Sequence, residues 1–207
     1  NWIKTTILDV VGDVEDKIFC DIFAGTGIVG RVFKKDVKQV IANDIEYYSY
    51  VLNQNYIKNH KPLKRANKLI DILNNLEPKE GFIYKNYCLG SGSGRQYFSD
   101  FNGKKIDAIR SKIKEWFESK FINENEYFFL LASLLESSDK VANTASVYGA
   151  FLKHLKNSAK KELELKPAFF EINDNEHQVY KDDANILIKK IKGDILYLDP
   201  PYNHRQY

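Results

Sequence analysis

Apolar and polar residues alternate at the two ends of the chain in a way that predicts strands followed by helices. The segment KIFCDIFAGTGIVGRVFKK predicts a buried strand at 18–23, a glycine-rich turn and a helix. The next segment, QVIANDIEYYSYVLNQNYIKNH, predicts a strand that ends at Asp44, followed by another helix. Near the other end, HQVYKDDANILIKKIKGDILYLDPPY predicts a strand to about Tyr180, a helix over 183–191 and a strand over 194–198. This order of elements is typical of a parallel α/β sheet.

The middle of the chain has the apolar spacing of helices instead. Apolar residues recur every three or four positions over 69–76 and 106–117, and an apolar run occupies 127–135. A fourth stretch, 143–161, has apolar residues among lysines and is interpreted as an amphipathic helix. The Gly/Ser-rich segment 88–103 interrupts these patterns and is expected to be a mobile loop.

Charge separates the same regions. The whole chain carries 31 Lys and Arg against 28 Asp and Glu, a net charge of +3. Residues 60–166 hold 19 of those basic residues and 13 of the acidic ones, so the middle is basic and the ends are mildly acidic. A basic segment indicates a polyanion as partner, although a solvated helical face gives the same balance.

Composition excludes several classes of protein. The 207 residues are 43% apolar, which is enough for a globular core. Cys20 and Cys88 provide neither a disulfide framework nor metal-ligand spacing, so we expect a cytoplasmic protein without a metal site. The apolar run at 127–135 is shorter than the roughly 20 residues of a membrane helix, and the N-terminal pattern is not that of a signal peptide.

A glycine-rich turn follows the first predicted strand. Gly25, Gly27 and Gly30 form a G-x-G-x-x-G pattern, whose glycines let the backbone approach a nucleotide closely. Asp44 ends the second strand 17 residues after Gly27, where a carboxylate accepts hydrogen bonds from the two hydroxyls of a ribose. NAD, FAD and S-adenosylmethionine all use this arrangement, and a tight turn beside an exposed acid would share it.

A second candidate site follows the strand over 194–198. There Asp199 precedes Pro200 and Pro201, which lack backbone N–H groups, so the strand has to end and the chain has to turn. In a doubly wound sheet with strand order 3-2-1-4-5, this fourth strand is the neighbour of the first. We therefore expect Gly25 and Asp199 to lie across one crevice at the carboxyl ends of the strands.

This second site has the groups needed to activate an aromatic amine, whose lone pair is delocalised into its ring. The carboxylate of Asp199 and the main-chain carbonyl of Pro200 accept the two N–H hydrogens of the amine, which localises the lone pair. Pro201 keeps that carbonyl rigid, and Tyr202 offers a face on which the base stacks after leaving the duplex. A plain Asp-Pro turn before a buried tyrosine is the alternative interpretation.

The motifs DIFAGTG, NDIE and DPPYNHRQY, in this order, resemble those of the N(6)-adenine-specific DNA methyltransferases of restriction-modification and Dam-type systems. The resemblance implies a Rossmann-like, doubly wound, S-adenosylmethionine-dependent methyltransferase fold. It also implies methyl transfer to the exocyclic amine of a flipped adenine in double-stranded DNA. Aspartate at position 199 favours adenine, because cytosine N(4) enzymes usually have serine there and protein glutamine methyltransferases have asparagine.

The same resemblance assigns roles to individual residues. Asp44 would bind the ribose of the cofactor, and Asp183 its adenine, with the neighbouring Asp182 as an alternative. The implied catalytic residues are Asp199, Pro200, Pro201 and Tyr202. The implied cofactor-binding residues are Asp21, Phe23, Ala24, Gly25, Thr26, Gly27, Asp44, Ile45, Asp183 and Asp199.

The spacing of the motifs favours the alpha subclass of this family. Gly27 and Asp199 are 172 residues apart, whereas three strand-helix units need only about 90 residues. We therefore expect residues 1–59 and 167–207 to form the catalytic domain, with residues 60–166 as an inserted, mainly helical target-recognition domain. The sheet is expected to be incomplete in this sequence, because the later strands of the family are absent.

The inserted domain is expected to contact DNA. Short polar side chains in 143–161 suit base edges, its lysines suit phosphates, and an arginine in the Gly/Ser-rich loop would reach a groove. A solvated basic face and a disordered loop are the alternative. The candidates are Arg95, Asn143, Thr144, Ser146, Lys153, Lys156, Lys160 and Lys161.

These inferences together predict a site-specific DNA adenine methyltransferase that acts as the modification enzyme of a restriction-modification system, with a cognate restriction endonuclease as partner. A ribosomal-RNA guanine methyltransferase, which can also carry DPPY, is the first alternative. The more remote alternatives are an NAD-dependent oxidoreductase, which shares the glycine pattern, and an inactive DNA-binding module.

Overall fold

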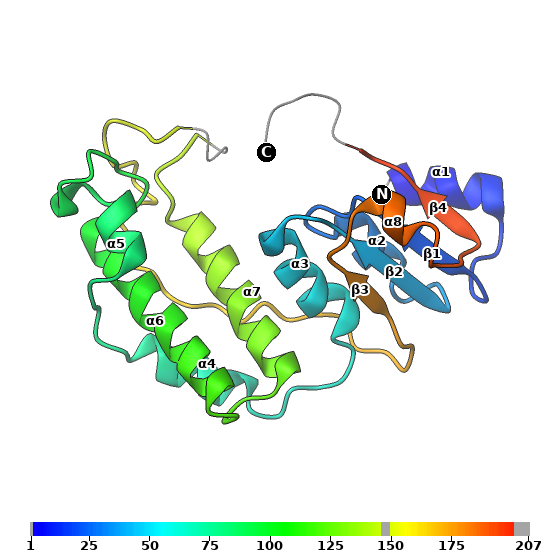
Figure 1. Cartoon of the computed structure of the whole chain (residues 1–207), viewed down its shortest axis with the longest axis horizontal. Helices are drawn as coiled ribbons and strands as arrows, with labels where there is room; N and C mark the ends of the chain where they lie inside the picture. The colour runs from blue at the N-terminus through cyan, green and yellow to red at the C-terminus, as the bar shows by residue number, and fades with distance from the viewer. Residues whose placement is uncertain (1, 146–149, 201–207) are drawn as a thin grey trace. The chain divides into compact units, whose positions relative to one another are not determined.

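The computed structural model describes residues 2–145 and 150–200. The chain divides into two compact units, which differ in architecture (Figure 1). The described parts of residues 1–63 and 169–204 form the first unit, and those of residues 64–168 form the second. Three predicted site residues lie outside the described residues: Ser146, Pro201 and Tyr202.

The first unit combines a sheet with helices. Its strands are β1 (Ile18–Asp21), β2 (Gln39–Asn43), β3 (Gln178–Tyr180) and β4 (Ile195–Tyr197). Its helices are α1 (Trp2–Val11), α2 (Ile28–Phe33), α3 (Tyr47–Asn53), the π-helix η1 (Gln54–Lys58) and α8 (Ala184–Leu187). The predicted α/β class is confirmed, and each predicted strand is present.

All strand pairings in this sheet are parallel, and the strand order is β3-β2-β1-β4 (Figure 1). Asp21 at the end of β1 lies opposite Ala42 of β2 on one side and Tyr197 of β4 on the other. This confirms the predicted order in which β4 is the neighbour of β1. The carboxyl ends of parallel strands share one edge, so the residues that follow the four strands gather there.

A tightly packed core fixes the helices against this sheet. Phe19 of β1 stacks on Phe33 of α2 with their ring centroids 4.5 Å apart. Val40 of β2 and Ile57 of η1 belong to the same cluster, and all four side chains have no exposed surface. Burying each such side chain stabilises the fold by about 1.5–3 kcal/mol. The glycine turn between β1 and α2 therefore starts and ends on rigid elements.

Polar contacts tie the chain segment before β3 to the rest of the first unit. The Nδ2 of Asn173 donates to the carbonyl of Lys34 at 2.9 Å. The backbone N–H of Val40 donates to Nδ1 of the buried His177 at 3.0 Å. Burial, with a smaller effect of nearby cations, lowers the pKa of His177 to about 4. The imidazole is therefore neutral at physiological pH and can accept this hydrogen bond.

The second unit is helical in its described residues. It contains α4 (Ala66–Asn74), α5 (Phe82–Tyr87), the 3₁₀-helix η2 (Leu89–Ser91), α6 (Asp100–Glu118) and α7 (Glu124–Lys140). The hydroxyl of Ser99 caps α6 by accepting the N–H of Asn102 at 3.2 Å. Asn123 and Glu126 form a capping box at the start of α7. These caps explain why the two long helices begin where the sequence places short polar residues.

Three predicted elements are wrong in extent. The described residues of 143–161 contain no helix, because Thr144 pairs with Phe151 in an antiparallel bridge and turns follow. The helix predicted over 183–191 is reduced to α8. The segment 88–103 is not a loop throughout, since α6 begins at Asp100.

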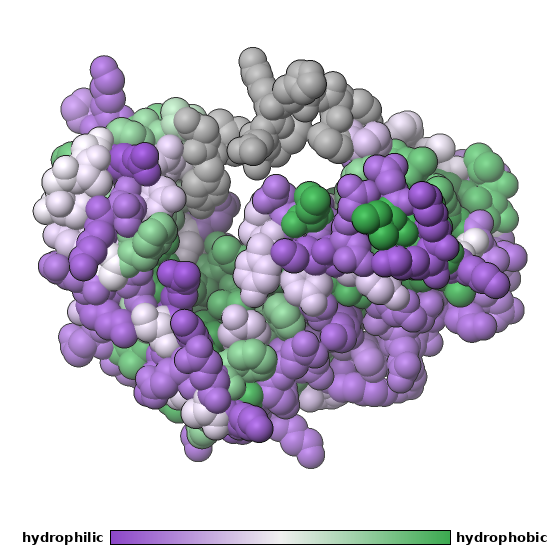
Figure 2. Space-filling model, viewed as in Figure 1, coloured by the Kyte–Doolittle hydropathy of each residue, from purple (hydrophilic) through white to green (hydrophobic). Residues whose placement is uncertain are grey.

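Hydrophilic residues predominate on the viewed face, and hydrophobic residues are exposed there in separate patches (Figure 2). Within residues 2–145 and 150–200, the structure has no helix with the length and apolar character needed to cross a membrane.

Candidate active site

The glycine turn joins the end of β1 to α2 in a tight loop. Gly25 and Gly27 have φ angles of 52° and 77°, in the left-handed region that glycine adopts without strain. The N–H of Gly27 donates to the carbonyl of Ala24 at 2.8 Å, and the N–H of Ala24 donates to the carbonyl of Asn43 at 2.9 Å. Apart from Gly25 itself and its two neighbours along the chain, no atom of the described residues lies within 4 Å of the position of a Cβ on Gly25. The turn is thus internally bonded and open on one side.

Asp44 follows β2 and is hydrogen-bonded to this turn. Its Oδ2 accepts the N–H of Gly25 at 2.8 Å, and its Oδ1 accepts the N–H of Glu46 at 2.9 Å. Each carboxylate oxygen has a second lone pair, and the residue is only half-buried. Asp44 therefore keeps acceptor capacity for hydroxyl groups. The adjacent Ile45 exposes 65% of its surface and offers an apolar contact at the same edge.

Asp21, the last residue of β1, is a buried acid at the same edge and is only 1% exposed. Burial raises the pKa of its carboxyl to about 7; the N–H of Phe23 opposes this effect, and the carboxylates of Asp199 and Asp44 add to it. The Oδ1 of Asp21 has no hydrogen-bond partner within the described structure. At neutral pH the carboxyl of Asp21 is therefore protonated in a fraction of the molecules.

Asp199 and Pro200 follow β4 and are exposed. Because Tyr197 of β4 lies opposite Asp21 of β1, the segment after β4 begins beside the end of β1. Burial raises the pKa of Tyr197, and the charges of Asp199 and Asp21 raise it further. The described part of the predicted amine-binding motif thus lies at the carboxyl edge of the sheet.

Asp183 is exposed and caps α8, with its Oδ1 accepting the N–H groups of Asn185 at 2.8 Å and Ile186 at 3.3 Å. The preceding residue, Asp182, is held by Asn43, a buried side chain that sequence reasoning missed. The N–H of Asp182 donates to Oδ1 of Asn43 at 2.9 Å, and Nδ2 of Asn43 donates to the carbonyl of Asp182 at 3.1 Å. The loop after β3 is therefore fixed to the end of β2.

The sequence prediction places ten cofactor-binding residues on four loops, and the structure brings these loops to one edge of the sheet. Among the residues of the glycine motif, Asp21, Ala24 and Gly27 are buried, Phe23 and Gly25 are half-buried, and Thr26 is exposed. Sequence reasoning also missed Asn53, whose Nδ2 donates to the carbonyl of Gly25 at 3.0 Å. The available signal was an asparagine in an apolar helical stretch, because a buried amide requires partners.

Asn143, a predicted DNA contact, is instead a buried structural residue of the second unit. It has no exposed surface. Its Nδ2 donates to the carbonyls of Gln96 at 2.9 Å and Leu152 at 2.8 Å, and its Oδ1 accepts the N–H of Lys156 at 3.0 Å. The prediction that Asn143 reads base edges is wrong, because its side chain already satisfies neighbouring backbone groups. The same bonds explain the missing helix, since they fix the backbone in another conformation.

The other DNA-contact candidates differ in exposure. Thr144 is buried, and the ammonium of Lys156 donates to its carbonyl at 2.8 Å. Arg95 is exposed, with its guanidinium carbon 5.8 Å from the ring centroid of Tyr87. The candidates that remain exposed for phosphates are Arg95, Lys153, Lys160 and Lys161.

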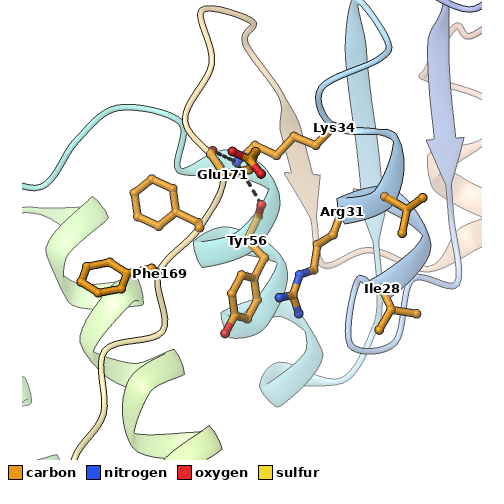
Figure 3. A pocket seen from close by; sticks show the side chains of 8 residues that line it. Ile28, Arg31, Lys34, Tyr56, Phe169 and Glu171 are labelled. Carbon is orange, nitrogen blue, oxygen red and sulfur yellow. Dashed lines mark hydrogen bonds between the residues drawn. The ribbon is translucent and has the colours of Figure 1, made fainter.

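A pocket of about 420 Å³ in the first unit is lined by none of the predicted cofactor-binding residues (Figure 3). The guanidinium carbon of Arg31 lies 3.6 Å from the ring centroid of Tyr56, toward which it points in the figure. The fully buried Lys34 donates to the carbonyls of Tyr56 at 3.0 Å, Asn59 at 2.5 Å and Glu171 at 2.8 Å. Burial lowers the pKa of Lys34 to about 8. Through these contacts the residues that line the pocket connect α2, η1 and the segment before β3, which is a structural role.

The described residues contain no cluster arranged to bind a metal ion, and both cysteines are buried. No group of three or more His, Cys, Asp or Glu side chains in residues 2–145 and 150–200 is arranged to hold a metal ion. Cys20 and Cys88 are buried free thiols, and burial raises their pKa values to about 11 and about 12. Both thiols therefore stay protonated at neutral pH and are poor nucleophiles.

Comparison with known proteins relates the whole chain to a set of methyltransferases. Type II methyltransferase M.NlaIII of Neisseria lactamica is 66% identical over 208 residues, which cover 100% of this chain and 62% of the relative. Type II methyltransferase M.FokI of Planomicrobium okeanokoites is 39% identical, over 99% of this chain and 34% of the relative. Modification methylase StsI of Streptococcus sanguinis is 37% identical, over 97% of this chain and 32% of the relative.

The chain spans less than two thirds of the length of each of these relatives. No solved structure gives a significant match. The family model for the D12 class N6 adenine-specific DNA methyltransferases matches residues 1–207, the whole chain. With the glycine turn, Asp44 and Asp199 on one edge of a parallel sheet, this match shows that the chain belongs to the D12 class N6 adenine-specific DNA methyltransferase family.

Proposed function

We propose that this chain carries the catalytic site of a site-specific DNA adenine methyltransferase. Its substrates would be S-adenosylmethionine and double-stranded DNA, and its target the exocyclic amine of a flipped adenine. The observation that carries the proposal is the shared edge of β1, β2 and β4, where the Gly25–Asp44 hydrogen bond lies beside the segment of Asp199. A cofactor-binding turn and acceptors for the N–H hydrogens of the amine are both needed for methyl transfer to an exocyclic amine.

The residues at the turn fit S-adenosylmethionine. The side of Gly25 that a Cβ would occupy is open, and Asp44 keeps lone pairs for the two hydroxyls of a ribose. Oδ1 of Asp183 already accepts the N–H groups of Asn185 and Ile186. The second oxygen, Oδ2, would accept a hydrogen bond from the amino group of the adenine moiety. When bound, S-adenosylmethionine supplies an electrophilic methyl group. The chain would supply its binding through Phe23, Gly25, Gly27, Asp44, Ile45 and Asp183.

Asp199 and Pro200 would act on the target amine. Their carboxylate and carbonyl oxygens accept the two N–H hydrogens, which localises the lone pair and stabilises the positive charge that develops on nitrogen. Tyr202 would stack on the base once it has left the duplex, which offsets part of the few kcal/mol that extrusion costs.

The helical second unit would provide target recognition. Its sequence carries the basic excess of the chain, and Arg95, Lys153, Lys160 and Lys161 are exposed there. The relatives of this chain are named "Type II methyltransferase" and "Modification methylase". We extend this role to the present protein, with a cognate restriction endonuclease as its functional partner. The family match favours this function over ribosomal-RNA guanine methylation or NAD-dependent oxidation.

Transfer of a labelled methyl group tests the proposal. The full-length protein is incubated with methyl-labelled S-adenosylmethionine and a mixture of duplex oligonucleotides, which are then digested to nucleosides. We expect label in N6-methyldeoxyadenosine alone. Label in methylcytosine, or no transfer by the folded protein, would contradict the proposal.

Asp199→Ala is the matched variant for the amine site. It should abolish transfer while the affinity for S-adenosylhomocysteine stays within about tenfold, or about 1.4 kcal/mol. Asp16→Ala, which removes an exposed acid elsewhere in the first unit, should leave both unchanged. Turnover by Asp199→Ala within a few-fold of the wild type would exclude Asp199 as the amine acceptor.

A further inference from the structure

The carbonyl of Gly25 is held by a side chain from another element. Asn53 is the last residue of α3 and is 1% exposed. Its Nδ2 donates to the carbonyl of Gly25 at 3.0 Å and to the carbonyl of Ser49 at 2.9 Å. Both amide hydrogens of Asn53 are therefore used, one within its own helix and one on the glycine turn.

Gly25 is thus fixed at both of its backbone polar groups. Its N–H is bonded to Asp44, and its carbonyl is bonded to Asn53. Asp44 and Asn53 both come from the segment that follows β2, and β2 pairs with β1 in the sheet. Each of these bonds stabilises the conformation that it holds, and does so more strongly where the groups are shielded from water. The left-handed conformation of Gly25 is therefore set by side chains of the protein itself.

The amide oxygen of Asn53 faces the second glycine of the motif. A Cβ built on Gly27 would lie 2.4 Å from Oδ1 of Asn53 and 3.2 Å from its Cγ. This oxygen has no hydrogen-bond partner in the described part of the chain, so the Cα–H side of Gly27 is what it contacts. Such a contact is weakly attractive for a C–H group and prohibitive for a methyl group. Gly27 is required here by Asn53 as well as by its φ of 77°.

The helix changes its register directly after Asn53. The π-helix η1 begins at Gln54, and the N–H of Asn59 donates to the carbonyl of Gln54 at 3.0 Å across five residues. A π-helical turn accommodates one more residue than an α-helical turn and so rotates the side chains that follow it. Asn53 is therefore the last side chain presented in the register of α3. Asn55, two residues later, is also buried, and its Oδ1 accepts a hydrogen bond from Nδ2 of Asn59 at 3.4 Å.

We infer that Asn53 is a positioning residue that holds the glycine turn in its cofactor-binding shape before the cofactor binds. It does so by fixing the carbonyl of Gly25 and by admitting only glycine at position 27. The inference rests on the proposed function, in which this turn binds S-adenosylmethionine. A turn that is already shaped loses little conformational entropy on binding, so the effect of Asn53 falls on cofactor affinity. Asn53 acts through Gly25 and Gly27 and does not touch the reacting atoms.

Calorimetry with S-adenosylhomocysteine tests this inference on the full-length protein. Asn53→Ala and Asn53→Asp both remove the donor to Gly25, and Asn53→Ser is the substitute if one of them does not fold. We expect each folded variant to bind at least about tenfold more weakly, the equivalent of about 1.4 kcal/mol. The KM for S-adenosylmethionine should rise by a similar factor while kcat stays within about twofold. Asn55→Ala, the matched buried asparagine, should leave the affinity within about twofold.

A double-mutant cycle separates positioning from a general loss of stability. Gly27→Ala meets two penalties in the wild type, the left-handed φ and the contact with Asn53, but only the first in the Asn53→Ala background. Gly27→Ala should therefore cost at least about threefold less affinity in that background. Additive losses in the cycle would overturn the inference.

The outcomes also distinguish this inference from the proposed function. A wild type that binds S-adenosylhomocysteine, with Asn53 variants that bind equally well, would overturn the role of Asn53 and leave the proposed function standing. A wild type that does not bind S-adenosylhomocysteine would overturn the proposed function and this inference with it.

Discussion

The N–H of Gly25 donates to Oδ2 of Asp44 at 2.8 Å, which bonds the turn after β1 to the residue that follows β2. The two residues are the first and second halves of the nucleotide-binding pattern in the sequence. In the folded chain the two residues act together, because the carboxylate that would bind a ribose also orients the turn. A change at Asp44 therefore affects both the ligand contact and the shape of the turn.

Asp44→Ala should weaken S-adenosylhomocysteine binding by about 100-fold, because it removes a charged acceptor for Gly25 and for the ribose, worth about 2–3 kcal/mol. Asp44→Asn should weaken it less, since the amide oxygen still accepts one N–H. Isothermal titration calorimetry measures both affinities. Equal affinity of wild type and Asp44→Ala would show that the cofactor binds elsewhere.

Asp21→Asn should flatten the pH dependence of stability. The pKa of Asp21 is about 7 in the fold against 3.8 for an ordinary aspartate. Because the folded value is raised, the stabilising effect of its proton is complete below pH 3.8 and is lost as pH rises through 7. Between pH 5 and pH 8 the wild type should therefore lose about 3 kcal/mol that Asp21→Asn does not lose. Urea unfolding at both pH values without cofactor measures this, and parallel curves for the two proteins would refute it.

His177→Gln should change the pH dependence in the opposite direction. The pKa of His177 is about 4 in the fold and 6.5 ordinarily, so the neutral form is favoured in the fold. Its contribution is complete above pH 6.5 and is lost as pH falls toward 4. The wild type should lose about 2–3 kcal/mol more than His177→Gln between pH 7.5 and pH 4.5. Hydrogen exchange of the β1 and β2 amides reports it, with the exposed His154→Gln as control.

Replacing Lys153, Lys160 and Lys161 together by alanine should weaken DNA binding across all sequences. Each lost phosphate contact should reduce the slope of log affinity against log salt by about 0.9. Lys156 is left in place because its ammonium donates to the carbonyl of Thr144. Fluorescence anisotropy over a salt series measures the slope. An unchanged slope would mean that these lysines are only a solvated face.

The matched control for this triple variant replaces three other exposed lysines of the second unit, Lys64, Lys68 and Lys114. Their substitution should leave the slope as in the wild type. Cofactor affinity should stay constant in both variants, because none of these lysines belongs to the unit that carries the glycine turn.

Asn143→Ala should destabilise the second unit by about 2–4 kcal/mol, because it leaves the carbonyls of Gln96 and Leu152 and the N–H of Lys156 without their partner. The sequence preference of methylation should not change. Thermal unfolding measures the stability, and Asn157→Ala, at an exposed asparagine of the same segment, is the control. A stable Asn143→Ala variant with altered sequence preference would restore the original base-reading interpretation.

The sequence alone determined the α/β class, the order of the strands, and the place of Gly25, Asp44 and Asp199 at strand ends. These inferences depend on local features: apolar alternation, glycines that adopt left-handed φ, and prolines that end a strand. A parallel sheet then brings its carboxyl ends to one edge whatever the remaining sequence is. The same motifs also carried the resemblance to the family that the whole chain matches.

The structural role of individual polar residues follows from long-range packing. Asn143 and the lysines near it have the local pattern of a basic helix, but bonds to Gln96, distant in sequence, hold that segment in turns. Asn43 and Asn53 carry no motif, yet they fix the loops around the candidate cofactor site. The pKa values of Asp21 and His177 likewise follow from burial. The partners of a buried polar side chain depend on the packing of distant segments, which the local pattern along the chain does not specify.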